Sequence, residues 1–213
     1  AIMGRTGSGK STIANLIGRI YDISNGDILI DKTPIDKINL NDLRSNIGYV
    51  PQEVFLFSET IANNISFGLT GVNVSKKTIE EAAKNAAIYR NIIEFPDRFE
   101  TFVGERGITL SGGQKQRISI ARAIIRKPQI LIFDDCLSSV DTETEEEILN
   151  NLKIIMQDKT SIIISHRVSS VKHADHIIIL DEGKVIEEGK HTYLIDKKGV
   201  YFDLFQKQQL ENS

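Results

Sequence analysis

The sequence predicts an α/β fold in which a parallel β-sheet is flanked by helices and interrupted by a helical insertion. Short apolar runs alternate along the chain with segments of helical periodicity. Two of these runs, Ile130–Phe133 and Ser161–Ile164, are rich in β-branched residues, as is typical of buried parallel strands. A glycine-rich segment, Gly4–Ser11, opens a predicted helix and fits G-x4-G-K-[ST] at every fixed position.

The composition allows one globular domain, or two lobes, with a substantial core. The chain has 213 residues, of which 40% are hydrophobic, and a net charge of −3. The mildly acidic balance argues against a nucleic-acid-binding protein. A single cysteine, Cys136, excludes a disulfide framework and suits a reducing cytoplasm. No apolar run reaches the 18 or so residues of a membrane span, and no signal peptide is recognisable.

The first third of the chain predicts two strands and two helices. Ser11–Ile20 places its apolar residues on one helical face. Asp27–Asp31 and Ile47–Val50 are strand candidates, and a short helix near Asn41–Ser45 separates them. The pattern is helical from about residue 59 to residue 127, most clearly over Ile79–Ile93, which is rich in Ala, Glu and Lys.

The last third returns to alternating strands and helices. Asp141–Met156 predicts a helix, with Thr142 and Glu145 at capping-box spacing. Ile177–Leu180 and Lys184–Glu187 flank an Asp-Glu-Gly turn and predict a hairpin. A helix is expected to close the chain, over residues 201–210.

The glycine-rich segment predicts a phosphate-binding loop. Its glycines let successive backbone N–H groups point inward, and the helix that follows adds roughly half a positive charge at its N-terminus. Lys10 would then face the β- and γ-phosphates of a nucleotide, and the Ser11 hydroxyl a Mg²⁺ ion. The alternative is a glycine-rich turn before an ordinary helix. The predicted ligand-binding residues here are Gly4, Thr6, Gly7, Ser8, Gly9, Lys10, Ser11 and Thr12.

A second motif is Leu-Ser-Gly-Gly-Gln, at residues 110–114, before an apolar-periodic helix at Ile118–Ile125. Ser111, Gly112 and Gly113 thus predict a second anion site. With the phosphate loop, this motif resembles the ATP-binding cassette family, where it closes over ATP held by another copy of the domain. The resemblance implies that the protein works as half of a pair. It also implies ATP contacts from the signature and from a later motif, made by Ser111, Gly112, Gly113, Gln114 and Asp141.

The apolar strand Ile130–Phe133 ends in Asp134, as a Walker B motif requires. Such a strand would deliver the carboxylate to the edge of the sheet, beside the metal. In isolation an acidic residue at a strand end is more often a helix cap. Gln52 matches the family's Q-loop, although a glutamine after proline is usually a solvated loop residue. The resemblance implies a Mg²⁺ site made by Ser11, Gln52 and Asp134.

Asp135 departs from the resembled family, whose active members carry Glu at this position to polarise the attacking water. The shorter side chain withdraws the carboxylate by about 1.5 Å, and such a misplacement costs on the order of 10²-fold in rate. In one interpretation, this chain is the impaired half of a heterodimeric exporter. In the other, Asp135 still acts, through a water or a small backbone shift. The impaired-half interpretation is preferred, but His166 occupies the position of the family's γ-phosphate histidine, which keeps the second interpretation open. The implied catalytic residues are Asp135, His166 and Gln52.

Segments at Phe55–Ile65 and Glu100–Gly107, and the closing helix, are similar to those of multidrug or lipid exporters. The resemblance implies a P-loop NTPase core at residues 1–53 and 128–213, a helical signature subdomain at 54–127, and a cytoplasmic place at the plasma (inner) membrane. The partners it implies are a second nucleotide-binding domain and an upstream transmembrane domain. Because so little of the first strand precedes Gly4, we expect an N-terminal truncation that removes the adenine-stacking aromatic residue.

Two rival functions belong to other classes. One is a binding module that holds ATP and shapes its partner's site with little turnover of its own. The other is a soluble cassette ATPase of DNA repair or translation, which would carry a long coiled-coil or linker insertion that is not seen here. Basic residues near the signature could suggest nucleic acid, but a solvated, partly salt-bridged helix face is favoured. They are Lys115, Arg117, Arg122 and Arg126.

Overall fold

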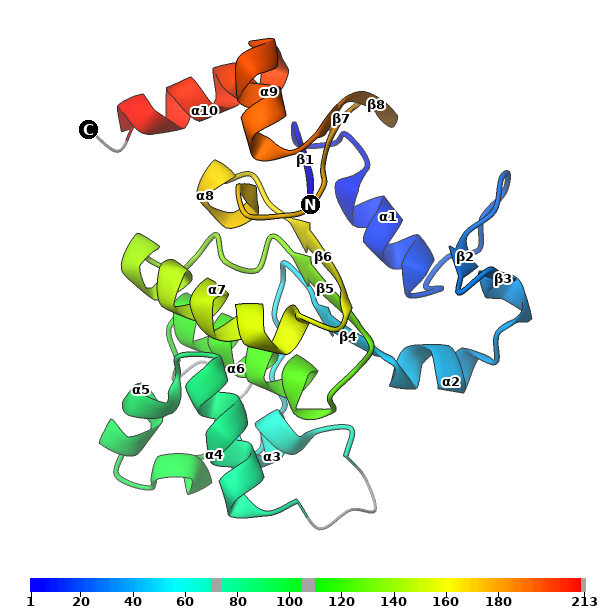
Figure 1. Cartoon of the computed structure of the whole chain (residues 1–213). Coiled ribbons are helices and arrows are strands. Elements are labelled where there is room, and N and C mark those ends of the chain that lie inside the picture. The colour runs from blue at the N-terminus through cyan, green and yellow to red at the C-terminus, as the bar shows by residue number, and fades with distance from the viewer. Residues whose placement is uncertain (70–73, 105–109, 212–213) are drawn as a thin grey trace.

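The computed structural model describes residues 1–69, 74–104 and 110–211. A six-stranded sheet of order β4-β5-β6-β1-β7-β8 runs through the middle of the molecule (Figure 1). Its neighbours pair in parallel from β4 to β7, and β8 is antiparallel to β7. The strands are β1 (Ile2–Gly4), β4 (Ile47–Val50), β5 (Ile130–Asp134), β6 (Thr160–Ile164), β7 (Ile177–Asp181) and β8 (Lys184–Gly189). A separate two-stranded sheet contains β2 (Leu29–Ile30) and β3 (Thr33–Pro34). The parallel sheet confirms the predicted α/β fold.

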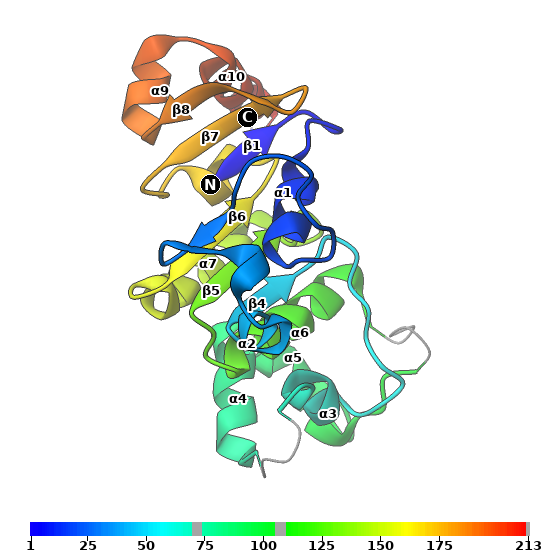
Figure 2. The same cartoon turned by 90° about the vertical axis from the view of Figure 1, so that its right-hand side faces the viewer.

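Helices cover both faces of the sheet. They are α1 (Lys10–Ile17), α2 (Leu40–Ser45), α3 (Ile61–Ser66), α4 (Lys76–Asn85), α5 (Tyr89–Glu94), α6 (Gly112–Ile125), α7 (Thr142–Met156), α8 (Val168–Val171), α9 (His191–Lys197) and α10 (Val200–Glu211), with 3₁₀ turns η1 (Ile35–Lys37) and η2 (Arg98–Glu100). None of the described helices is long and apolar enough to cross a membrane. Figure 2 shows α3 to α6 gathered at one end of the molecule, below β4.

The alternation of side chains along β5 assigns the helices to the two faces. Ile132 packs in one cluster with residues of α1 and α2, whereas Leu131 and Phe133 pack in another with α6 and α7. The second cluster also contains α3, α4 and α5, so the helical segment shares its core with the sheet. The proposed division at residues 53 and 127 stays a prediction. A third cluster packs α8, α9 and α10 against β1 and β7.

Several predicted elements have different limits in the structure. The first helix ends at Ile17 instead of Ile20, because Gly18 caps it and Arg19 takes a left-handed φ of 46°. The predicted helix at 79–93 is two helices, because Ala87 has a φ of 53°. Of the predicted strand at 27–31, only Leu29 and Ile30 pair, and they do so outside the main sheet. The hairpin at 177–187 and the closing helix are confirmed.

Two predictions about polar residues are wrong. The cap of α7 is Asp141, whose side chain accepts a hydrogen bond from the Thr144 N–H, and Glu145 is instead buried. Arg117 and Arg122 of α6 are not on a salt-bridged, solvated face. Their guanidinium groups donate to backbone carbonyls, those of Ala87 and Gly113 for Arg117 and of Phe55 and Asn64 for Arg122. These two arginines therefore hold segments of the fold together through hydrogen bonds to backbone carbonyls.

Gly4 is required by close approach at the end of β1. It has a φ of +150°, and a Cβ there would collide with the backbone carbonyl oxygen of Leu180 on β7. We expect Gly4→Ala to lower the free energy of unfolding by about 3 kcal/mol. Gly18→Ala is the matched control, since its φ is −74° and its new Cβ would lie 3.5 Å from the nearest atom. Denaturant melts of both variants check this; equal stability would contradict the close approach.

Candidate functional site

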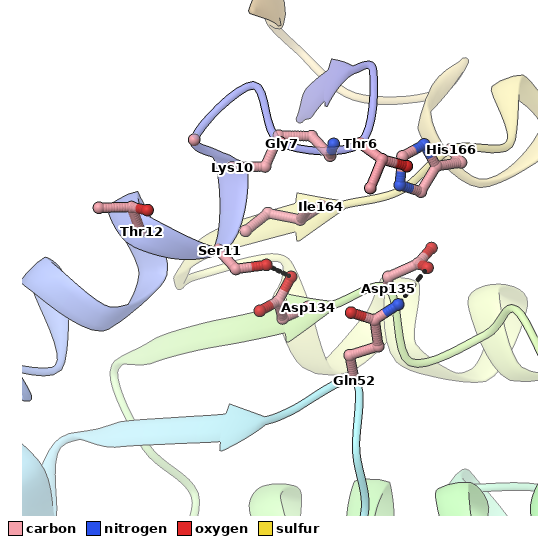
Figure 3. Close-up of a pocket in the computed structure, with 11 residues that line it drawn as sticks. Thr6, Gly7, Lys10, Ser11, Thr12, Gln52, Asp134, Asp135, Ile164 and His166 are labelled. Atoms are coloured by element: carbon pink, nitrogen blue, oxygen red, sulfur yellow. Dashed lines mark hydrogen bonds between the residues drawn. The ribbon is translucent and has the colours of Figure 1, made fainter. Parts of the chain in front are cut away.

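A pocket of about 230 Å³ opens at the carboxyl edge of the sheet. Because β4, β5, β6 and β1 run parallel, the loops that follow them meet at this edge. The pocket is lined by Thr6, Gly7, Gly9, Lys10, Ser11, Thr12, Gln52, Asp134, Asp135, Ile164 and His166. All but Ile164 were singled out from the sequence. Figure 3 shows Thr6 and His166 on one side of the pocket, opposite Gln52 and Asp134.

The loop between β1 and α1 forms one wall. Gly9 precedes α1 in a left-handed conformation with a φ of 99°, which a glycine adopts without strain. Lys10 is 6% exposed, and its Nζ donates to the carbonyl oxygens of Gly4 at 3.0 Å and Arg5 at 2.8 Å. Burial lowers the pKa of Lys10, an effect that Asp135 and Asp134 oppose. The lysine is thus a confined cation at the start of a helix, as an anionic ligand requires.

Asp134 lies between two hydroxyl groups. Ser11 Oγ donates to its Oδ1 at 3.0 Å, and the Tyr49 hydroxyl donates to its Oδ2 at 3.2 Å. Burial, and then the charge of Asp134, raise the pKa of Tyr49 to about 12. Sequence reasoning missed Tyr49. Its signal is the strand register, because Tyr49 pairs with Ile132, two residues before Asp134 and on the same face.

Asp135 begins the turn after β5 with a left-handed φ of 45°, and its N–H donates to the Ile164 carbonyl at 2.8 Å. Its Oδ2 accepts a hydrogen bond from Gln52 Nε2 at 3.2 Å (Figure 3). Burial raises the pKa of Asp135, and nearby His166 opposes that shift. The structure therefore brings together the three residues predicted to be catalytic.

The signature residues do not line the pocket. Ser111 and Gly112 are exposed, and Ser111 caps α6 in a capping box with Gln114. The Ser111 N–H donates to Gln114 Oε1 at 2.9 Å, so this N–H of the predicted second anion site is already occupied. Gly113 packs closely on Ser139, where a Cβ would lie 3.1 Å from the carbonyl oxygen. Of the exporter-like segment Glu100–Gly107, residues 105–107 lie outside the described residues.

Arg167, the residue after His166, forms an ion pair and hydrogen bonds that the sequence did not reveal. Arg167 donates to Glu145 Oε2 at 2.6 Å and to the carbonyl oxygens of Val140 and Ser138 at 3.1 Å. Glu145 is 2% exposed at its side chain and also accepts from Ser170. The segment next to His166 is therefore tied to the segment before Asp141.

Comparisons with known proteins agree with this geometry. A family model described as ABC transporter matches residues 1–138. The chain is 46% identical over 210 residues to the multidrug resistance-like ATP-binding protein MdlA of Escherichia coli (strain K12), covering 99% of this chain and 35% of that protein. It is 46% identical over 209 residues to the ATP-dependent lipid A-core flippase of Shewanella frigidimarina, covering 98% and 35%.

A solved structure, described as a bacterial Atm1-family ABC exporter with ATP bound, matches with a TM-score of 0.93 and 42% identity. The match covers 97% of this chain and 36% of that one. The chain thus spans about a third of the length of these proteins.

Proposed function

Since this chain belongs to the ABC transporter family and has its ATP-binding α/β fold, we propose that it hydrolyses ATP as the nucleotide-binding domain of a membrane exporter. The observation that carries the proposal is the convergence, in one pocket, of Lys10, the Ser11–Asp134 pair and the Gln52–Asp135 pair. A cation, a metal-binding hydroxyl–carboxylate pair and a candidate base are what phosphoryl transfer to water requires.

The residues present fit ATP and Mg²⁺. Backbone N–H groups of the loop before α1 and of its first turn, with the Lys10 ammonium, would bind the phosphates. Ser11, Gln52 and Asp134 offer a hydroxyl, an amide oxygen and a carboxylate, the oxygen ligands that Mg²⁺ prefers. When bound, Mg²⁺ would neutralise charge on the phosphates. Lys10 would exchange its two carbonyl partners for phosphate oxygens.

We propose that Asp135 accepts the proton of the attacking water, with Gln52 and His166 placing the water and the γ-phosphate. The raised pKa of Asp135 favours a base, since a carboxylate nearer to neutral pH accepts a proton more readily. The short side chain opposes this role. The hydrogen bond from Gln52 holds the carboxylate at the pocket, which supports catalysis through a water or a small backbone shift.

The competing proposal makes this chain the impaired half of a heterodimer, whose partner carries Glu and hydrolyses ATP for both. It rests on Asp135 alone, because the shorter carboxylate is the departure from the family pattern. In this proposal the chain is chiefly a binding module. Its pocket would hold ATP through the same loop, and its signature would complete the partner's site.

We propose that a second nucleotide-binding domain covers the signature. Ser111 and Gly112 are exposed and lie outside the ATP pocket of their own chain, although a serine hydroxyl and the N-terminus of a helix suit a phosphate. Asp141 is also exposed. A phosphate presented by another copy would meet these groups, so that ATP lies between the two domains.

Ser111→Arg is expected to leave ATP binding to this chain unchanged and to block ATP-dependent association with the partner domain. The bulky cation would fill the space that the partner's phosphate needs. Nucleotide binding and ATP-dependent association, measured on the full-length protein, check this, with Asn150→Arg at an exposed position of α7 as the matched control. Loss of the chain's own ATP binding, with folding preserved, would contradict the proposed geometry.

The names of two relatives support a proposal about the transported substrates. The E. coli relative is named for multidrug resistance and the Shewanella relative for lipid A-core flipping. We therefore propose that the chain is coupled to an upstream transmembrane domain, on the cytoplasmic face of the plasma (inner) membrane, and drives export of drugs or lipids. A soluble cassette ATPase is disfavoured, because no long coiled-coil insertion is present in the sequence.

A further inference from the structure

We propose that Gln208, on the C-terminal helix α10, is a positioning residue for His166. The inference rests on the proposed ATP hydrolysis, and it assigns to α10 a part in the active site. Gln208 is 42 residues away from His166 along the chain. It contacts the backbone of the loop that carries the histidine.

The Gln208 side chain contacts the loop on both sides of the histidine. Its Nε2 donates to the His166 carbonyl oxygen at 2.6 Å, and its Oε1 accepts from the Val168 N–H at 2.7 Å. Both ends of the amide are therefore used, and the pattern fixes which end carries the oxygen. A glutamine bound in this way behaves like a neighbouring strand, because it pairs with one backbone acceptor and one backbone donor two residues apart.

His166 lines two cavities. One is the nucleotide pocket. A second cavity of about 470 Å³ has residues of α7 and α10 in its lining, and His166, Arg167, Phe205 and Gln208 line it. Val168 is buried in the cluster that contains α9 and α10, and Arg167 bonds Glu145, Val140 and Ser138, whereas His166, between them and Ser165, is exposed. The two amide hydrogen bonds fix the backbone at residues 166 and 168, and with it the point from which the His166 side chain extends.

The helix that carries Gln208 is itself fixed to the sheet. The buried Glu187 carboxylate, on β8, accepts from the N–H groups of Val200 at 2.9 Å and Tyr201 at 3.1 Å. The Tyr201 side chain is fully buried, and its hydroxyl lies 2.7 Å from His191 Nδ1. The N-terminus of α10 is thus held on β8, and its last turns are held on the His166 loop.

The test uses the full-length protein. Gln208→Ala is expected to lower kcat for ATP hydrolysis by about 10-fold, less than the roughly 10²-fold cost of a 1 Å misplacement, while the KM for ATP stays within about twofold. Gln208→Glu keeps an acceptor for the Val168 N–H but turns a second acceptor oxygen toward the His166 carbonyl oxygen, so it should not restore the wild-type kcat. Gln206→Ala, at an exposed position of the same helix, is the matched control and should keep the wild-type kcat.

A double-mutant cycle separates positioning from general support of the fold. In a His166→Ala background, Gln208→Ala should cause no further loss of kcat, because the residue on which it acts is gone. The proposal would be overturned if Gln208→Ala lowered kcat equally in both backgrounds, or if it caused no loss when made alone in the wild-type protein.

Hydrogen exchange tests the same contact without catalysis. The amide of Val168 should exchange faster in Gln208→Ala than in the wild type or in Gln206→Ala. Unchanged exchange would overturn the positioning role. If the wild-type protein hydrolyses no ATP at all, the proposed function fails, and the exchange measurement still decides whether Gln208 holds the loop.

Discussion

Lys10→Ala is expected to weaken ATP binding by at least about 100-fold, which is about 2.7 kcal/mol. Lys10 is nearly buried at the start of α1, where its ammonium is the compact charge that faces the phosphates. Its removal leaves the phosphates with backbone donors alone. The loss should appear in equilibrium binding of ATP to the full-length protein, with Lys32→Ala, at an exposed position, as the control.

Near-native affinity of the Lys10→Ala variant would refute the assignment of the phosphate loop. The stability of the variant must be measured beside its affinity, because Lys10 also bonds the Gly4 and Arg5 carbonyls. A variant that melts like the wild type and binds no ATP supports a direct role in phosphate binding.

Asp135→Glu is expected to raise ATP hydrolysis at the site containing Lys10 by about 10-fold, or about 1.4 kcal/mol of barrier, if the short side chain limits catalysis. The added methylene returns the carboxylate to the reach that the family pattern implies. Steady-state turnover of the full-length protein measures this. An unchanged rate would show that the length of the side chain is not what limits the reaction.

Asp135→Asn distinguishes the two proposals for this site. In a heterodimer whose partner carries Glu, it should change turnover little, because the competent base lies in the other site. In a homodimer it should abolish turnover, because both sites lose their carboxylate. Brisk hydrolysis by a wild-type homodimer that Asp135→Asn silences would refute the impaired-half proposal.

Sequence patterns predicted the parts of the fold that local chemistry determines. The apolar run at 130–133 is short and rich in isoleucine, as is typical of a buried parallel strand, and it is the β5 of the sheet. The parallel order then brings the pocket residues to one edge. Helix ends were less predictable, since Arg19 and Ala87 take left-handed conformations that their residue types do not suggest.

The features that the sequence could not predict are contacts between elements far apart in the chain. Glu145 has capping-box spacing to Thr142, yet its carboxylate is better satisfied by Arg167 of another segment. Tyr49 reaches Asp134 only because β4 lies next to β5. Gln208 stands among several glutamines in a helix, and nothing local distinguishes it from Gln206.

The central claim is that ATP bound at the Lys10 pocket is closed over by the signature of a second domain. The most direct test uses the full-length protein with a photo-reactive label attached to the thiol of the Thr6→Cys variant. Thr6 is an exposed residue of the pocket lining. The variant must first be shown to bind ATP. With ATP present, we expect a species larger than the single chain, in which the label joins a Leu-Ser-Gly-Gly-Gln-type peptide of the second domain. Cross-links confined to this chain's own residues 110–114, or formed equally without ATP, would contradict it.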